Sequence, residues 1–362
     1  MTINYVPFLK LKSNEIMAVK ELETELRQSM TPFFDFPYKK NRTEADLIRT
    51  ANRIFGSISR NINDIPYFYL DNYDVDSDLI VDGSDNYAYL LNASEGLPVV
   101  PVISIDRRPE HMQAVCEAKD TGQLESDLIA LRFGQEDFEN YDIIADDIEE
   151  YLSDTIKKFE NVDLVLDCRF CLNQDLDSLT SKIILFIQKF SEAYSVNRVI
   201  VTGSSIPASI SDILSVHEEV EITRTELDVF ESVYKEIGKN CEIALGDYGI
   251  ISPNYSDVDI PPNVIFNVIT AKIIYTFDKH HYIIRGGGIK THKRGYQQYN
   301  DLAAIIVSKP FYRGANYSFG DNYIEEKSRS VGPNVTQNTI LKPTINLHIT
   351  YMLNGFIPAL VS

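Results

Sequence analysis

The sequence predicts an α/β protein built on a (β/α)8 TIM-like barrel, and three observations lead to this prediction. Short apolar runs alternate with amphipathic stretches at a spacing of about 30 residues through the first two-thirds of the chain, as repeated strand–helix units do. Eight such strands can be counted, which is the number that closes a barrel. The turn after the first strand, Leu9–Lys12, lacks the glycine-rich phosphate loop that is typical of an open doubly wound sheet.

The eight predicted strands are apolar on both faces, as expected for parallel strands that helices cover. In chain order they are Tyr5–Lys10, Thr31–Phe36, Pro66–Leu70, Pro98–Ile105, Asp127–Phe133, Asp163–Cys168, Arg198–Thr202 and Cys241–Leu245. An amphipathic helical stretch follows each of the first seven strands. These helices begin at Ser13 and near Thr43 and continue with Tyr87–Leu91, Pro109–Ala118, Glu136–Lys158, Leu179–Phe190, Ile210–Leu214 and Thr225–Ile237.

Toward the C-terminus the alternation of strand and helix stops. Val268–Phe277 and His281–Arg285 predict the two arms of a β-hairpin, and Gly286–Gly288 is expected to end it. His280 and His281 lie at the predicted turn, where we expect both side chains to be exposed.

The rest of the chain predicts an insertion and a closing helix. Tyr299–Val307 has a helical pattern, and the polar region that follows through Asn338 has none. Ile345–Leu353 predicts a last helix, which we expect to pack on the barrel as its eighth outer helix. The predicted organisation is a barrel over residues 1–252, a hairpin-containing insertion or cap over 253–344, and a closing helix and tail over 345–362.

Composition indicates a cytoplasmic globular protein. With 362 residues, 44% of them hydrophobic and 24% charged, the chain can bury a large core without disulfides or metals. Its four cysteines are too few for a disulfide framework. The segment Met1–Tyr5 has neither the basic nor the apolar part of a signal peptide, and no apolar run is long enough for a membrane span. We therefore expect no association with a membrane.

The charge is divided unevenly along the chain. The formal net charge is −19, which by itself disfavours binding to nucleic acid. Residues 271–362, however, hold 11 basic and 5 acidic side chains, a net charge of +6, which leaves −25 for residues 1–270. This asymmetry predicts that the two parts of the chain serve different functions.

Five short segments, taken in this order, resemble a known family. They are Tyr5–Lys10 with the following Glu15, Thr31–Asp35, Tyr282–Gly286, Tyr317–Asp321 and Asn346–Thr350. Together they resemble the "beta protein" family of phages and bacterial mobile elements across nearly the whole chain. Membership implies a mobile-element or defence setting, sometimes beside nuclease-like proteins, and it carries no catalytic residues over. Phe319 departs from the family pattern, where a tryptophan is expected.

The C-terminal ends of the strands are where barrels place their active sites. The candidate catalytic residues at these ends are Lys10, Asp35, Asp71, Asp167 and Asp247, and the candidate ligand-binding residues are Arg132, Arg169, Thr202, Ser204 and Tyr248. Such a mouth could hold a divalent cation, with Mg²⁺ the first candidate, and a phosphate-bearing ligand clamped by guanidinium groups. Alternatively, the aspartates cap helices or form structural ion pairs.

Two other motifs lie near the strand ends. Cys168 and Cys171 have C-x-x-C spacing but straddle a strand end without a second pair, so we expect them to be structural. Thr202–Ser205 could offer backbone N–H groups to a phosphate, or form an ordinary turn in which Ser205 caps a helix. No histidine stands at any predicted strand end, which argues against a His-ligated zinc site there.

The segment 285–296 is the most distinctive in the C-terminal part. It combines three consecutive glycines, Gly286–Gly288, with Arg285, Lys290, Lys293 and Arg294. This composition suits a nucleic acid backbone, nucleotide phosphates or an acidic protein partner. The alternative is a hairpin exit whose charge complements the acidic body of the same protein.

Two further ligand-binding candidates come from the family landmarks. Asp321 lies in a predicted tight turn that would aim it at the barrel mouth, and His348 lies on the predicted last helix.

Three functional hypotheses follow. The first is a component of a phage-conflict system whose barrel mouth recognises a phosphate-bearing or acidic ligand or protein partner. The second is a metal-assisted phosphoester hydrolase that uses the strand-end carboxylates. The third is a structural subunit that forms homo-oligomers by pairing its basic tail with an acidic body.

Overall fold

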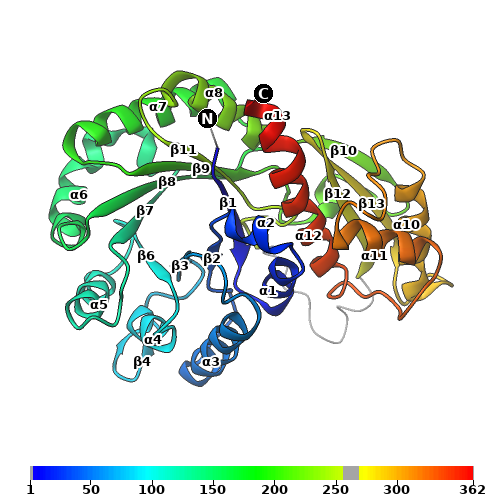
Figure 1. Ribbon diagram of the computed structural model, residues 1–362, viewed down its shortest axis with the longest axis horizontal. Helices are drawn as coiled ribbons and strands as arrows, with labels where there is room; N and C mark the ends of the chain where they lie inside the picture. Colours follow the sequence, from blue (N-terminus) through cyan, green and yellow to red (C-terminus); the bar gives the residue numbers. More distant parts are fainter. Residues whose placement is uncertain (1–2, 256–268, 362) are drawn as a thin grey trace.

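Eight parallel strands form the closed barrel that the sequence predicts (Figure 1). In the computed structural model, which describes residues 3–255 and 269–361, their order around the barrel is β1-β11-β9-β8-β7-β6-β3-β2. The bounds are β1 (Tyr5–Lys10), β2 (Phe33–Asp35), β3 (Phe68–Asp71), β6 (Val99–Ile103), β7 (Leu128–Gly134), β8 (Asn161–Phe170), β9 (Arg198–Ser204) and β11 (Ile243–Asp247). Every predicted strand is confirmed, with ends that differ by a residue or two.

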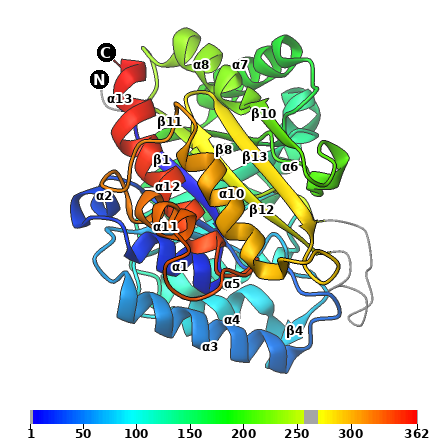
Figure 2. The same cartoon turned by 90° about the vertical axis from the view of Figure 1, so that its right-hand side faces the viewer.

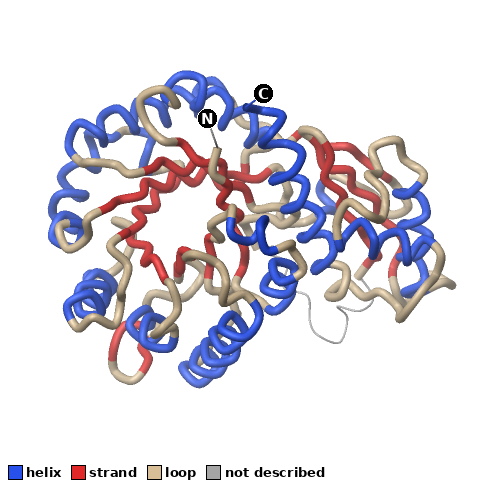
Figure 3. Tube along the Cα trace, viewed as in Figure 1, coloured by secondary structure: helices blue, strands red, loops and turns tan. Residues whose placement is uncertain are grey.

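Helices surround this barrel (Figure 3). They are α1 (Ser13–Lys20), α3 (Glu44–Asn61), α4 (Asn86–Ala93), α5 (Pro109–Asp120), α6 (Tyr141–Ile156), α7 (Leu176–Ala193) and α8 (Thr225–Ile237). The region predicted as Ile210–Leu214 forms only a 3-10 turn, Ile210–Asp212. Three short elements were not predicted: α2 (Thr24–Gln28) and the strands β4 (Ile80–Val81) and β5 (Ser84–Asp85).

Helix α3 illustrates how the sequence defines these elements. Thr43 accepts a hydrogen bond from the backbone of Asp46, whose side chain accepts one from the backbone of Thr43 in return. This capping box satisfies backbone N–H groups that the first turn of a helix leaves unpaired. Leu47, Ala51 and Ile54 then recur on one face and are buried against the barrel.

The inside of the barrel has a layered filling. Phe8 and Phe33 stack in the middle with ring centroids 4.2 Å apart, flanked by the rings of Tyr248 and Tyr69 and by aliphatic side chains. At the N-terminal end of the strands, Arg198 pairs with Asp163 at 2.8 Å. A second, larger group of charged side chains fills the C-terminal end. The barrel is therefore a packed core, and ligands can reach only its ends.

A three-stranded antiparallel sheet lies beside the barrel and forms the base of a C-terminal lobe (Figure 2). Its order is β10-β13-β12, with bounds Glu219–Thr223 for β10, Thr270–Phe277 for β12 and His280–Gly288 for β13. The predicted hairpin is confirmed over the described residues, and the predicted start of its first arm at Val268 lies outside them. Strand β10 belongs to the connection between β9 and α8, and the sequence did not predict it.

Three predictions about the lobe are wrong. Gly286–Gly288 does not end the hairpin, because β13 continues through all three glycines. The region predicted to be irregular contains helix α11 (Phe319–Ser328), capped by the side chain of Ser318. His281 is fully buried, because the turn is tighter than predicted and places its side chain in the interface with the barrel. The predicted helix near Tyr299 is confirmed as α10 (Gln298–Val307).

The last helix closes the ring of outer helices, as predicted. Helix α12 (Leu341–Tyr351) packs beside α1, where the amide of Asn346 donates to the carbonyl of Ala18 at 3.1 Å. A π-helical turn, Met352–Phe356, connects it to α13 (Ile357–Val361), which ends near α8 (Figure 1). Its other side contacts β12 and α11, so the same helix joins barrel and lobe.

Gly320 marks the closest approach of α11 to α12. A Cβ atom at this position would stand 2.0 Å from the carbonyl oxygen of Pro343 and 2.8 Å from the Cβ of Leu347. We expect Gly320→Ala to lower the free energy of unfolding by about 1–3 kcal/mol, because backbone atoms must move apart. Chemical denaturation measures this, with Gly56→Ala on α3 as the control. Equal stability of the two variants would contradict this packing.

Candidate functional site

Arg132 stands at the centre of the charged side chains that fill the C-terminal end of the barrel. Its Nη1 donates to Asp35 and to Asp71, each at 2.7 Å, and its Nη2 donates to Asp167 at 2.6 Å. Nη2 also reaches the hydroxyl of Tyr248 at 2.8 Å, and Nε reaches Asp167 at 3.2 Å. All five N–H donors of the guanidinium are therefore used inside the protein.

This network continues outward from Arg132. Lys10 donates to Asp35 at 3.1 Å and to Asp74 at 2.6 Å, while Arg107 pairs with Asp71 at 3.0 Å. Burial alone would raise the pKa of Asp35, but Arg132 and Lys10 outweigh it and hold that pKa well below its usual value. We call these seven side chains the mouth network: Lys10, Asp35, Asp71, Asp74, Arg107, Arg132 and Asp167.

The mouth network brings four of the predicted catalytic residues together, but around a cation that the chain itself supplies. Asp35, Asp71 and Asp167 all direct an oxygen toward the guanidinium of Arg132. Within residues 3–255 and 269–361, no three His, Cys, Asp or Glu side chains are placed to hold a metal ion. A divalent cation such as Mg²⁺ would have to displace Arg132, so the donors in their present arrangement do not fit it.

A cavity of about 430 Å³ opens outward from the mouth network. The ring of Tyr73 lies at its wall with three guanidinium groups around it, those of Arg132 and Arg169 at 4.5 Å and that of Arg107 at 5.2 Å from the ring centroid. Among the described residues, Nη1 of Arg169 and Nε of Arg107 have no hydrogen-bond partner although both are buried. Buried N–H groups without partners are costly unless a ligand or water satisfies them.

The backbone at Arg169 supports a role in this cavity. Arg169 has φ +52°, a left-handed conformation that side chains other than glycine rarely adopt, at a bulge near the end of β8. Its N–H donates to Asp167 at 2.9 Å, and its Nη2 donates to the carbonyl of Pro253 at 2.9 Å. These contacts hold the guanidinium over Tyr73.

Tyr73 and Arg107 were not predicted as site residues. Both lie in loops just after strands β3 and β6, where side-chain direction follows from tertiary contacts and not from strand alternation. The one feature of the sequence that could have pointed to Arg107 is its position, since Arg107 and Arg108 directly follow Asp106 near the end of a predicted strand. Asp106 itself pairs with Arg107 at 3.0 Å and lines the same cavity.

Asp247 does not join the mouth network, although the sequence predicted that it would. Side chains alternate along a strand, and it is the next residue, Tyr248, that faces the inside of the barrel. Asp247 points outward, where it pairs with Arg224 at 2.5 Å and accepts from the hydroxyl of Tyr5 at 2.8 Å. His348 of α12 also contacts it at 3.1 Å.

The contacts of Asp247 extend into the lobe through His348, Thr276 and His281. His348 bonds Asp247 through Nε2 and the hydroxyl of Thr276 through Nδ1, at 2.8 Å. That hydroxyl also meets Nδ1 of His281 at 3.0 Å. If Nε2 of His348 carries its proton, the hydroxyl donates to His348 and accepts from His281, so each contact has one donor. Burial lowers the pKa of both histidines, which favours these neutral forms.

The remaining strand-end candidates, Thr202 and Ser204, do not line the cavity at the mouth, and neither do the two cysteines. The hydroxyl of Ser204 donates to the carbonyl of Ile251 at 3.3 Å and accepts from the N–H of Ile206 at 3.1 Å, so it closes a turn. Thr202 is buried inside the barrel. Cys168 and Cys171 are buried free thiols, and their mutual hydrogen bond, together with burial, raises the pKa of Cys168. A reactive cysteine needs a lowered pKa, because the thiolate is the nucleophile, so the raised pKa of Cys168 argues against such a role.

The C-terminal candidates do not reach the barrel mouth. Asp321 is the third residue of α11 and not part of a tight turn, and its buried carboxylate accepts from Tyr275 of β12 at 2.5 Å. Arg285 donates to the carbonyl of Leu214 at 2.6 Å and lines a separate cavity of about 510 Å³ with His217 and Asp301. Lys290 is exposed, two residues after the end of β13.

Comparison with known proteins assigns the chain to a family. A family model described as "Beta protein" matches residues 5–354. No curated protein matches the chain. In the part of the chain that the structure describes, no helix has the length and apolar character needed to cross a bilayer. Because the family model covers nearly the whole sequence, the chain belongs to the Beta protein family.

Proposed function

We propose that this protein is a binding component of a phage-conflict system, and that its barrel mouth recognises a phosphate or carboxylate group on a small ligand or protein partner. The observation that carries the proposal is the pair of buried, unpartnered N–H groups of Arg107 and Arg169 on the cavity beside Tyr73. Guanidinium groups bind such anions through short, charge-assisted hydrogen bonds. The phage-conflict setting comes from the family resemblance alone and stays a prediction.

Binding is favoured over hydrolysis by the pairing of the carboxylates. A general base or a metal ligand needs an oxygen that is open to the reactants. Asp35 and Asp167 instead accept from Arg132, and Lys10 holds a second oxygen of Asp35. Assembly into homo-oligomers and contact of the 285–296 segment with nucleic acid also stay predictions.

Pyrophosphate is a suitable first probe of the mouth. We expect it to bind the wild-type protein in calorimetric titration and to bind Arg169→Gln about tenfold more weakly, since one charge-assisted hydrogen bond is lost. Arg49→Gln is the matched control, because Arg49 is 74% exposed on α3. Equal affinities of wild type and Arg169→Gln, or no binding by either, would refute the proposal.

A further inference from the structure

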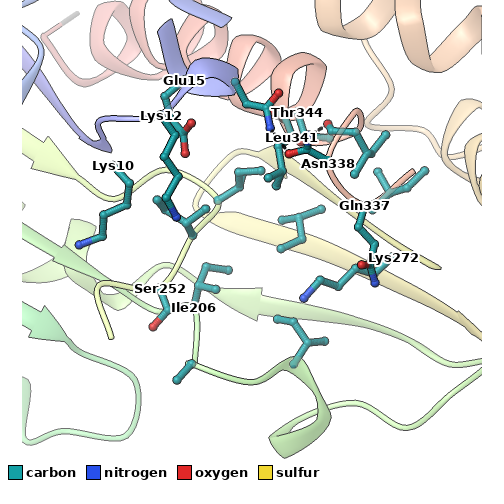
Figure 4. A pocket seen from close by; sticks show the side chains of 18 of the residues that line it. Lys10, Lys12, Glu15, Ile206, Ser252, Lys272, Gln337, Asn338, Leu341 and Thr344 are labelled. Atoms are coloured by element: carbon teal, nitrogen blue, oxygen red, sulfur yellow. Dashed lines mark hydrogen bonds between the residues drawn. The ribbon is translucent and has the colours of Figure 1, made fainter. Parts of the chain in front are cut away.

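A second cavity, of about 600 Å³, lies where the barrel meets the C-terminal lobe. Figure 4 shows its wall, to which the turn between β1 and α1, the loops after β9 and β11, strand β12 and the turn before α12 contribute. We call it the seam cavity. Among residues 3–255 and 269–361, only Asn254 lines both this cavity and the one at the barrel mouth, so the described walls of the two cavities are distinct.

Cationic side chains that form no salt bridge are the first unusual feature of the seam cavity. Lys12 and Lys272 extend into it from different sides, while Lys10 points away toward Asp35 (Figure 4). Within the described ranges, neither Lys12 nor Lys272 forms an ion pair, and Arg53 contacts only the hydroxyl of Ser13, at 2.8 Å. In a chain with a net charge of −19, such a concentration of unpaired cations is unexpected without an anionic ligand.

Buried polar groups without partners are the second feature. Glu15 is 3% exposed, and its Oε2 has no hydrogen-bond partner in the part of the chain that the structure describes. The hydroxyl of the fully buried Tyr299 likewise forms no hydrogen bond within the distance and angle limits of one there, although the backbone N–H of Lys272 lies near it. Both side chains line the cavity, so both can donate to an anion if Glu15 is protonated. Burial raises the pKa of Glu15 to about 7, which makes the protonated carboxyl available at neutral pH.

The remainder of the wall is mostly apolar. It includes Ile206, Pro207, Ile250, Ile251, Ile273, Ile274, Ile340 and Leu341. A bare inorganic ion would leave this surface in contact with water, at a cost of about 25 cal/mol per Å². The wall therefore favours a ligand that carries an apolar body beside its charge.

We propose that the seam cavity is a binding site for a small amphiphilic anion. Lys272 and Lys12 attract the anionic group, Glu15 and Tyr299 donate hydrogen bonds to it, and the isoleucine-rich wall receives the apolar body. This inference stands apart from the proposed function of the barrel mouth, because the residues that carry the two proposals are different.

The fluorescent sulfonate 1-anilinonaphthalene-8-sulfonate is a direct probe, with the uncharged N-phenyl-1-naphthylamine for comparison. We expect one sulfonate to bind per chain, and Lys272→Met to weaken that binding about tenfold while Lys272→Arg retains it. The uncharged probe should bind wild type and Lys272→Met alike. Lys239→Met, a change at an exposed lysine after α8, is the control, and circular dichroism confirms that each variant is folded.

The pH dependence tests Glu15 separately. Glu15 faces Lys10, Lys12 and the other cations of the cavity, so its ionisation places a negative charge beside the bound sulfonate. We expect affinity to fall as pH rises from 6 to 8, and Glu15→Gln to keep the affinity seen at low pH throughout. The proposal would be overturned if neither Lys272→Met nor Glu15→Gln changed the affinity for the sulfonate or its pH dependence, or if the sulfonate did not bind at all. Pyrophosphate binding should stay unchanged in Lys272→Met, which keeps the two sites distinguishable.

Discussion

Replacing Arg132 with methionine should lower the free energy of unfolding by at least about 3–5 kcal/mol. The substitution leaves Asp35, Asp71 and Asp167 buried within a few ångströms of one another without the guanidinium that separates them. Ionised carboxylates in that setting repel one another and cannot recover their hydration. Since the whole stability of a domain is of the order of 5–15 kcal/mol, this single change should remove a large part of it.

Urea denaturation of Arg132→Met measures the loss, and a double-mutant cycle assigns its cause. Asp167→Asn should cost less in the Arg132→Met background than in the wild type, because the carboxylate it removes is then already unpaired. Arg49→Met, at an exposed ion pair with Asp46, should cost less than about 1 kcal/mol. If Arg132→Met proves as stable as Arg49→Met, the mouth network contributes nothing to the fold.

Acid should destabilise the protein through the histidines at the junction of barrel and lobe. His281 and His348 are buried and neutral with lowered pKa values, so below pH 6.5 the unfolded chain binds protons that the folded chain does not. The stability they provide is therefore complete above pH 6.5 and falls as pH decreases. Each histidine contributes a slope of up to about 1.4 kcal/mol per pH unit until its folded pKa is reached.

The slope of unfolding free energy between pH 6 and pH 4.5 is the quantity to measure. Glu15 acts in the opposite direction, because its raised pKa of about 7 lets the folded state hold a proton that the unfolded state releases. Variants are therefore compared with wild type, and His348→Gln should lower the slope by up to about 1.4 kcal/mol per pH unit, the contribution of one proton. An unchanged slope in His348→Gln would show that His348 is not neutral in the folded protein.

The barrel could be predicted because its signals are local. Each strand is a short apolar run before an amphipathic helix, and parallel strands put their C-terminal ends at one rim. Strand alternation then places Asp35, Arg132 and Asp167 on the inner face. Asp247 and Tyr248 were both named as candidates at the mouth, although adjacent residues of a strand point to opposite faces. Only Tyr248 points inward, because the last strand continues to Asp247, beyond its predicted end at Leu245.

The lobe and the edges of the site could not be predicted in this way. Strand β10 alternates charged and apolar residues over only five positions and forms because β13 lies beside it. His281 is buried because the lobe docks on the barrel, which no local pattern indicates. Tyr73, Arg107 and Lys272 acquire their roles from tertiary neighbours, as does Glu15, which the family landmarks included without a role.

The pairing of β10 with β13 also bears on how the chain is made. A ribosome releases β10 well before β13, so for a time the nascent barrel presents an open strand edge of the kind that other chains can join. Glu219 and Glu221 of β10 are both exposed, and their charges discourage such pairing while the hairpin is still being synthesised. We therefore expect the negative charge of β10 to reduce aggregation while the chain is being synthesised.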